Sequence, residues 1–160
     1  MKHVSGTPEK LKTKFWMELA DSPLLFLQLN SDPDSAVPMR AHLDRHASHA
    51  IWFFVANDHH LAARGPTIAT FASKDHHIFA RFEGVLSEET DQARRQKHWG
   101  NDVESWFPDG RESPSVIMLR MDLGNAEIWD HDLGILVNAK AALGMDLRAD
   151  AADRHTETAL

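Results

Sequence analysis

Apolar residues near the start of the chain recur every fourth position. Leu11, Phe15 and Leu19 follow this spacing, which places them on one face of a helix. Pro8 is favoured at a first helical position, and Pro23 disfavours helical backbone in the residue before it. The pattern predicts an amphipathic helix from Pro8 to Ala20.

After this helix the chain changes to short apolar runs separated by Gly, Asp, Asn and Pro. Runs of this length and spacing are typical of β-strands. The expected strands are residues 24–29, 39–43, 51–55, 67–72, 78–86 and 115–123, and then 126–129 after a turn at Gly124-Asn125. This order predicts a mostly antiparallel meander.

Three helical stretches are expected among or after these strands. Asp58 is a candidate cap for a short helix through Arg64, and residues 87–90 open a longer helix towards Trp99. Residues 134–143 form a third candidate. Strands with a few inserted helices favour an α+β, mainly β fold, namely a small barrel with helical caps.

One domain is expected, because 160 residues is the size of a single hydrophobic core. Arg148 to Leu160 is rich in alanine and charge and has no apolar period. We therefore expect a domain over residues 1–145 and a poorly ordered tail over residues 146–160. The chain shows no internal repeat.

Charge and composition exclude several classes of protein. The 17 basic and 24 acidic side chains give a net charge of -7, which repels nucleic acid and anionic lipid. No apolar run is long enough to span a membrane, and the N-terminus lacks a signal-peptide core. The absence of cysteine excludes disulfides and thiolate sites and fits a reducing compartment. We expect a cytoplasmic protein without nucleic-acid or membrane partners.

Eleven histidines raise the question of a metal site. They are spread over several short stretches, and neither a His-Glu-x-x-His helix nor a His-x-His pair occurs. We therefore expect no dedicated metal site, and a histidine-rich metal-binding protein is the third of three hypotheses. The chain also lacks a Gly-x-Ser-x-Gly elbow and glycine-rich phosphate loops, which excludes the corresponding hydrolases and nucleotide-binding domains.

Tryptophan is the second unusual feature, because the chain has five Trp and no Tyr. Burial accounts for Trp16 on a helix and Trp52 in a strand. Trp99 and Trp106 lie in an expected irregular connection, where a ligand or a second subunit would account for them.

Several motifs occur in a recognisable order. They are Val37-Pro38-Met39, Trp52-Phe53-Phe54-Val55, Phe71-Ala72-Ser73-Lys74, Trp106-Phe107-Pro108-Asp109-Gly110 and Leu143-Gly144-Met145-Asp146. In this order the chain resembles the general stress proteins of the pyridoxamine 5'-phosphate oxidase-like, FMN-binding split-barrel superfamily. The resemblance extends from the first helix to about Met145.

The resemblance implies a split β-barrel of about six to seven antiparallel strands that forms a homodimer, with FMN in the groove between subunits. The cofactor-binding residues that it implies are, along the flavin ring, Pro38, Met39, Arg40 and Ala41; through backbone groups, Phe53, Phe54 and Val55; near the phosphate, His59, His60 and Leu61; and, from the partner, Trp99 and Trp106. It assigns no catalytic side chain.

Three positions depart from the family pattern. Val37 stands where relatives commonly carry arginine, Leu61 where they carry lysine, and Val55 where they carry threonine. The first two changes remove positive charge opposite a phosphate that carries about two negative charges. Arg40, His59, His60 and the amides after Asp58 are the groups that would compensate.

The leading hypothesis is a flavin-dependent oxidoreductase that takes hydride from a reduced nicotinamide. The Arg-x-His substrate element of true pyridoxamine phosphate oxidases is missing near the C-terminus, so that activity is not expected. The alternative is a non-catalytic stress or sensor protein that holds a flavin in a degenerate pocket. The sequence does not indicate the substrate.

Overall fold

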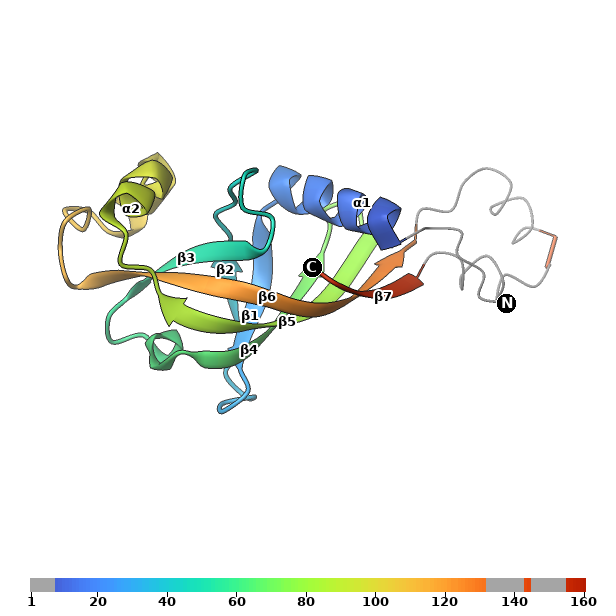
Figure 1. Cartoon of the computed structure of the whole chain (residues 1–160), viewed down its shortest axis with the longest axis horizontal. Helices are drawn as coiled ribbons and strands as arrows, with labels where there is room; N and C mark the ends of the chain where they lie inside the picture. Colours follow the sequence, from blue (N-terminus) through green and yellow to red (C-terminus); the bar gives the residue numbers. More distant parts are fainter. Residues whose placement is uncertain (1–7, 132–142, 145–154) are drawn as a thin grey trace.

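The computed structural model describes residues 8–131, 143–144 and 155–160. These residues form one antiparallel sheet covered by helices (Figure 1). The elements in chain order are α1 (Pro8–Asp21), β1 (Leu24–Leu29), β2 (Val37–Arg40), β3 (Ala50–Ala56), the 3-10 helix η1 (His60–Ala63), β4 (Gly65–Ala72), β5 (Ile78–Glu88), α2 (Gln92–His98), α3 (Asn101–Trp106), β6 (Val116–Asp130) and β7 (His155–Ala159).

The seven strands are arranged in the order β2-β1-β4-β5-β6-β3, and β7 also pairs with β6. The two ends of this order meet where His42, just after β2, forms a bridge with Trp52 of β3. The sheet is thereby closed at this bridge into a split barrel with an N-terminal helix and helical caps. The predicted fold class is confirmed.

Strand β6 runs without interruption through Gly124 and Asn125, so the predicted turn at this pair is wrong. The register with β5 shifts between Phe82 and Gly84, and β6 carries one residue more than β5 across this shift. Strands β5 and β6 therefore form a β-bulge at this point. A glycine within a strand is typical of a bulge, whereas Gly and Asn together also occur in turns. Before the bulge β6 pairs with β3, and after it β6 pairs with β7.

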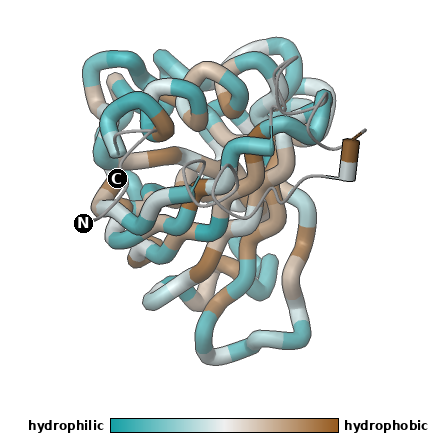
Figure 2. Tube along the Cα trace, turned by 90° about the vertical axis from the view of Figure 1, so that its right-hand side faces the viewer, coloured by the Kyte–Doolittle hydropathy of each residue, from teal (hydrophilic) through white to brown (hydrophobic). Residues whose placement is uncertain are grey.

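The main core lies between α1 and the sheet. Leu11, Phe15 and Leu19 are buried, as the spacing predicted, and α1 runs from Pro8 to Asp21. The Phe15 ring makes edge contacts with Phe71 and Phe82, at centroid distances of 5.8 and 5.4 Å. Figure 2 shows hydrophobic and hydrophilic residues interspersed along the chain trace.

Strand β3 is buried on both faces, which explains its continuous apolar sequence. The side chains of Ile51, Phe53 and Val55 point into the main core. Trp52 and Phe54 point the other way, into a second cluster with Trp99 and Val103 of the α2–α3 region.

The short helices differ from the prediction at their starts. The helix after β3 is a 3-10 helix capped by His59 and not by Asp58. Helix α2 begins after its cap Asp91, because Ser87 and Glu88 extend β5 instead. Trp106 lies in α3 and not in an irregular connection. The helix expected over 134–143 falls almost wholly outside the described residues.

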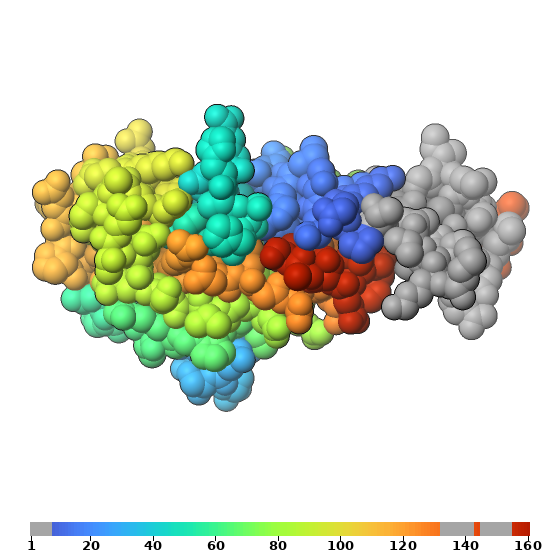
Figure 3. Space-filling model, in the orientation of Figure 1, coloured from blue at the N-terminus to red at the C-terminus, as the bar shows by residue number. Residues whose placement is uncertain are grey.

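The end of the predicted tail is ordered. Residues 155–159 form β7, which pairs antiparallel with β6 and lies beside α1 (Figure 3). The Leu160 amide donates to the Gly124 carbonyl at 3.0 Å, and the Leu160 side chain packs against the main core. Pairing with β6 gives these residues a regular strand that their local sequence does not predict, where a poorly ordered tail was expected. None of the described helices is long and apolar enough to cross a lipid bilayer.

Candidate functional site

The predicted ring-contacting strand is β2, whose side chains alternate in exposure. Val37 and Met39 are half-buried against the main core, whereas Pro38 and Arg40 are exposed. Ala41, just after the strand, is buried. The outer face of β2 therefore offers one apolar and one cationic side chain.

An ion pair connects β2 to α3. The Arg40 Nε lies 2.8 Å from Asp102 Oδ2. Helix α3 also carries Trp106, whose side chain is 82% exposed, an unusual exposure for an indole. The structure thus brings the predicted residues Arg40 and Trp106 to adjoining elements.

The predicted residues on β3 are available only through their backbone, because the side chains of Phe53, Phe54 and Val55 are all buried. Trp52 exchanges both backbone hydrogen bonds with His42, at 2.8 and 3.0 Å. Backbone groups alternate in direction along a strand, so the N–H and C=O of Phe54 point to this same edge. Within the described residues no strand pairs with this edge beyond the His42–Trp52 bridge.

The segment predicted near a phosphate, residues 59–61, forms the start of η1. His59 Nδ1 accepts a hydrogen bond from the Leu61 amide at 3.1 Å, and the two histidine rings stack with centroids 4.4 Å apart. His60 Nε2 lies 3.0 Å from the Ser35 carbonyl oxygen, which connects η1 to the turn before β2. Burial, followed by the charge of His60, lowers the pKa of His59. Leu61 is fully buried in the main core.

Arg64 is a cation in this region that the sequence analysis did not identify as a site residue. Its backbone has φ 63° and ψ -175°, a conformation that is normally restricted to glycine. Its guanidinium lies 3.5 Å from Glu88 Oε2. The signal in the sequence was an arginine directly before Gly65-Pro66, at the end of a short helix.

Trp99 is placed differently from Trp106. It is buried in the second cluster, in edge contact with Phe54 at 5.2 Å between centroids. Packing within the chain therefore accounts for its bulk, without a ligand or second subunit. Of the two predicted tryptophans, only Trp106 presents an exposed ring.

Arg95 fixes the connection that follows Trp106. Its buried guanidinium donates to the carbonyl oxygens of Gly110, Arg111 and Val116 at 2.9, 2.8 and 2.7 Å. Hydrogen bonds from one cation to several carbonyl oxygens hold the loop that carries them in one conformation. Arg95 is thus a positioning residue for this side of the candidate site.

Two histidines, His42 of the bridge and His98 at the end of α2, contact each other. His98 stacks on Trp52 with centroids 5.3 Å apart, and His42 makes edge contacts with His98 and Phe54. Burial lowers the pKa of His42 to about 4 and also lowers the pKa of His98. Both rings are therefore neutral near neutral pH.

A hollow of about 390 Å³ lies elsewhere, on the outer face of β4 to β7, and contains none of the predicted residues. Its lining residues are Ile68, Arg81, Phe82, Glu83, Asn125, Ala126, Glu127, Glu157 and Thr158.

Known proteins similar to this chain share both its sequence pattern and its fold. Residues 10–146 match the family model described as pyridoxamine 5'-phosphate oxidase like. No curated protein sequence matches the chain.

Among solved structures, a general stress family protein from Xanthomonas campestris pv. campestris is 34% identical over 77% of this chain and 88% of its own, with a TM-score of 0.70. The general stress FMN/FAD binding protein from Xanthomonas citri is 33% identical over 78% and 91%, with a TM-score of 0.72. General stress protein 26 from Jannaschia sp. CCS1 shares the fold, with a TM-score of 0.76 over 95% and 99% at 22% identity.

Proposed function

Because the chain belongs to the pyridoxamine 5'-phosphate oxidase-like family, we propose that it binds FMN and acts as a flavin-dependent oxidoreductase of the general stress type. The similarity to an FMN/FAD binding protein at 33% identity supports a flavin ligand. The observation that carries the proposal is the convergence of β2, α3 and the edge of β3 beside the His42–Trp52 bridge, with β2 and α3 joined by the Arg40–Asp102 ion pair.

These elements suit the ring of a flavin. The backbone N–H and C=O of Phe54 offer one donor and one acceptor for the polar edge of the ring. Pro38 offers an apolar contact on the outer face of β2, and the exposed Trp106 offers a surface for stacking from the partner subunit.

The phosphate end fits less well. Leu61 and Val37 supply no charge, and burial lowers the pKa of His59. Arg40 and Arg64 are the cations nearby, but Asp102 and Glu88 form ion pairs with them. A charge-assisted hydrogen bond contributes about 1.5–3 kcal/mol, so we propose FMN binding with a weakly anchored phosphate.

When bound, the flavin would supply the hydride chemistry, with a reduced nicotinamide as the electron donor. The protein would orient the ring through the backbone of Phe54 and the side chains of β2. Arg95 would hold the connection after Trp106 in place. No side chain is required as a general base.

A homodimer is part of the proposal, because the partner would complete each site. Leu24, Phe26 and Val85 are 50–55% exposed, which is unusual for large apolar side chains on one sheet. Phe26 lies directly opposite Pro38, so its exposed ring adjoins the proposed flavin strand. Light scattering should give twice the mass of one chain, and a monomeric mass would contradict this part of the proposal.

The second candidate is a non-catalytic flavin-binding stress or sensor protein. The buried Leu61 favours it, because this position cannot supply the missing cation. The rate at which a reduced nicotinamide reduces bound flavin distinguishes the two candidates. A catalytically useful rate supports the oxidoreductase, and bound flavin that stays oxidised supports the alternative.

The test of binding itself is a titration of FMN into untagged protein, followed by quenching of flavin fluorescence. We expect saturable binding in the micromolar range. FAD and riboflavin, titrated in parallel, show how much the phosphate contributes. Failure to bind any of the three at tens of micromolar would overturn the flavin proposal.

A further inference from the structure

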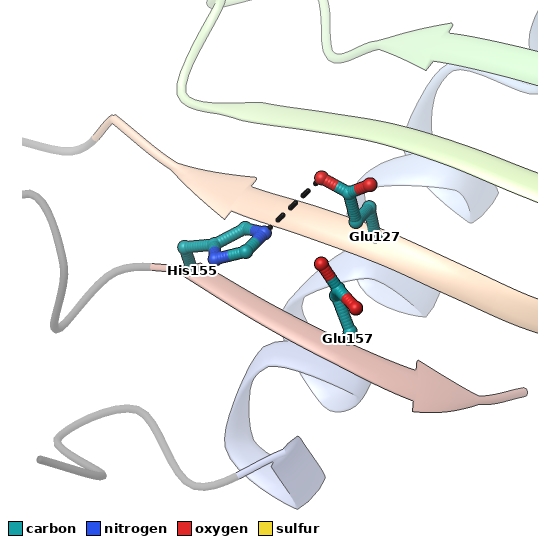
Figure 4. Close-up of side chains that lie close together, drawn as sticks. All are labelled: Glu127, His155 and Glu157. Carbon is teal, nitrogen blue, oxygen red and sulfur yellow. Dashed lines mark hydrogen bonds and ion pairs between the residues drawn. The ribbon is translucent and has the colours of Figure 1, made fainter. Parts of the chain in front are cut away.

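A histidine and two carboxylates converge on the paired strands β6 and β7. The candidate ligand atoms of Glu127, His155 and Glu157 all lie within 4.8 Å of one another. Figure 4 shows the His155 ring and both carboxylates on the same side of the two strands. His155 Nε2 lies 3.3 Å from Glu127 Oε2.

The register of the strands sets this arrangement. Glu127 and Glu157 are directly opposite each other, and His155 is opposite Trp129. The His155 ring stacks on Trp129 with centroids 5.4 Å apart, which fixes the plane of the imidazole. The three side chains are therefore held on two hydrogen-bonded strands and do not depend on a loop.

The charges in the cluster are unbalanced. Like charges directly opposite each other across strands destabilise the pairing. Arg81 compensates in part, since its guanidinium lies 2.7 Å from Glu127 Oε1. The other oxygen of Glu127 still faces His155, and Glu157 lies on the same face, so the cluster has room for a further positive charge.

The hollow described above lies directly beside the cluster, because Glu127 and Glu157 are among its lining residues. Asn125 and Glu83 also line the hollow and add oxygen atoms. A metal ion at the cluster would therefore keep open positions for water or a small anionic ligand.

We propose that Glu127, His155 and Glu157 bind a divalent first-row transition metal ion such as Zn²⁺. Such an ion takes imidazole nitrogen and carboxylate oxygen at about 2.0–2.2 Å. The two glutamate side chains have rotatable bonds that would let their oxygens approach one ion, while the paired strands hold the backbone in place. The site is separate from the proposed flavin residues, so neither proposal depends on the other.

Isothermal titration of metal-free, untagged protein with Zn²⁺ tests the proposal. We expect one ion per chain, and at least tenfold weaker binding in the His155→Ala and Glu157→Gln variants. Glu157 is exposed, so its variant tests the site even if the first one fails to fold. The matched control is His77→Ala, because His77 and Asp75 form a similar pair at 3.3 Å without a third ligand in the described structure.

A second measurement detects whether the ion stabilises the pairing of β7 with β6. Bound Zn²⁺ would hold β7 against β6. Hydrogen exchange of the amides of residues 155–159 should therefore slow when the ion is added, and it should not slow in the His155→Ala variant. Absence of binding, equal loss of affinity in His77→Ala, or unchanged exchange in β7 would each overturn the assignment.

Discussion

Arg40 on β2 and Asp102 on α3 form an ion pair in which Nε and Oδ2 are 2.8 Å apart. This ion pair determines how much of the positive charge of Arg40 is available to an anionic ligand. Both side chains are substantially exposed, so the pair itself contributes little to folding stability.

We predict that Asp102→Asn tightens FMN binding about three- to tenfold, because it removes the anion that competes with the flavin phosphate for Arg40. Fluorescence titration measures the change. Asp122→Asn is the control, since it breaks a pair with Arg120 of the same 2.8 Å length away from β2. An equal effect in both variants would refute a specific role for Arg40.

Restoring positive charge should cost much more stability at Leu61 than at Val37. Leu61 has no exposed surface, so Leu61→Lys places an ammonium in the core and should lower the free energy of unfolding by about 3 kcal/mol or more. Val37 is half-buried at the start of β2, and Val37→Arg should cost less than about 1 kcal/mol while tightening FMN binding. Urea denaturation and flavin titration of both variants check this. Equal stability of the two would show that Leu61 is not packed as described.

Arg64 should show opposite effects on stability and binding. Its φ of 63° with extended ψ costs about 1–3 kcal/mol for a non-glycine residue. We predict that Arg64→Gly raises the free energy of unfolding by about 1 kcal/mol and weakens FMN binding, whereas Arg64→Lys keeps the strain and most of the binding. A less stable glycine variant would show that the ion pair with Glu88 outweighs the strain.

Stability should fall on acidification between about pH 6.5 and pH 4. The pKa of His42 in the folded chain is about 4, lowered chiefly by burial, against an ordinary value of 6.5. As pH falls through this range the unfolded chain takes up the proton first, so unfolding is favoured, by up to about 3 kcal/mol at pH 4.

Urea denaturation at pH 7, 5.5 and 4 measures this loss. In His42→Phe the pH dependence should be reduced, whereas the exposed His46→Gln should retain it. Asp102, His98 and Arg40 also interact electrostatically with His42. An unchanged slope in His42→Phe would assign the effect to other groups.

Elements with a strong local pattern could be predicted from the sequence almost to the residue. Helix α1 was placed correctly because its apolar spacing and the flanking prolines act within a few residues. Strand β1 has the predicted bounds for the same reason. The order of the motifs predicted the family and the split barrel, and both are confirmed.

Features that depend on distant partners could not be predicted. The sequence of β7 has no apolar period, and its strand forms only because β6 offers an edge. Gly124-Asn125 suits both a turn and a bulge, and pairing with β5 selects the bulge. Trp99 is buried because β3 and the α2–α3 region, far apart in the chain, form one cluster.

The pairing of β3 with β6 has a consequence for synthesis of the protein. β3 carries the segment Ala-Ile-Trp-Phe-Phe-Val-Ala, which is buried on both faces, but its strand partner is residues 116–122. On the ribosome this segment is made long before that partner and stays unpaired until β6 emerges. A nascent chain arrested before Val116 would expose an aggregation-prone segment with high β propensity, and chaperones should bind mainly to residues 50–56.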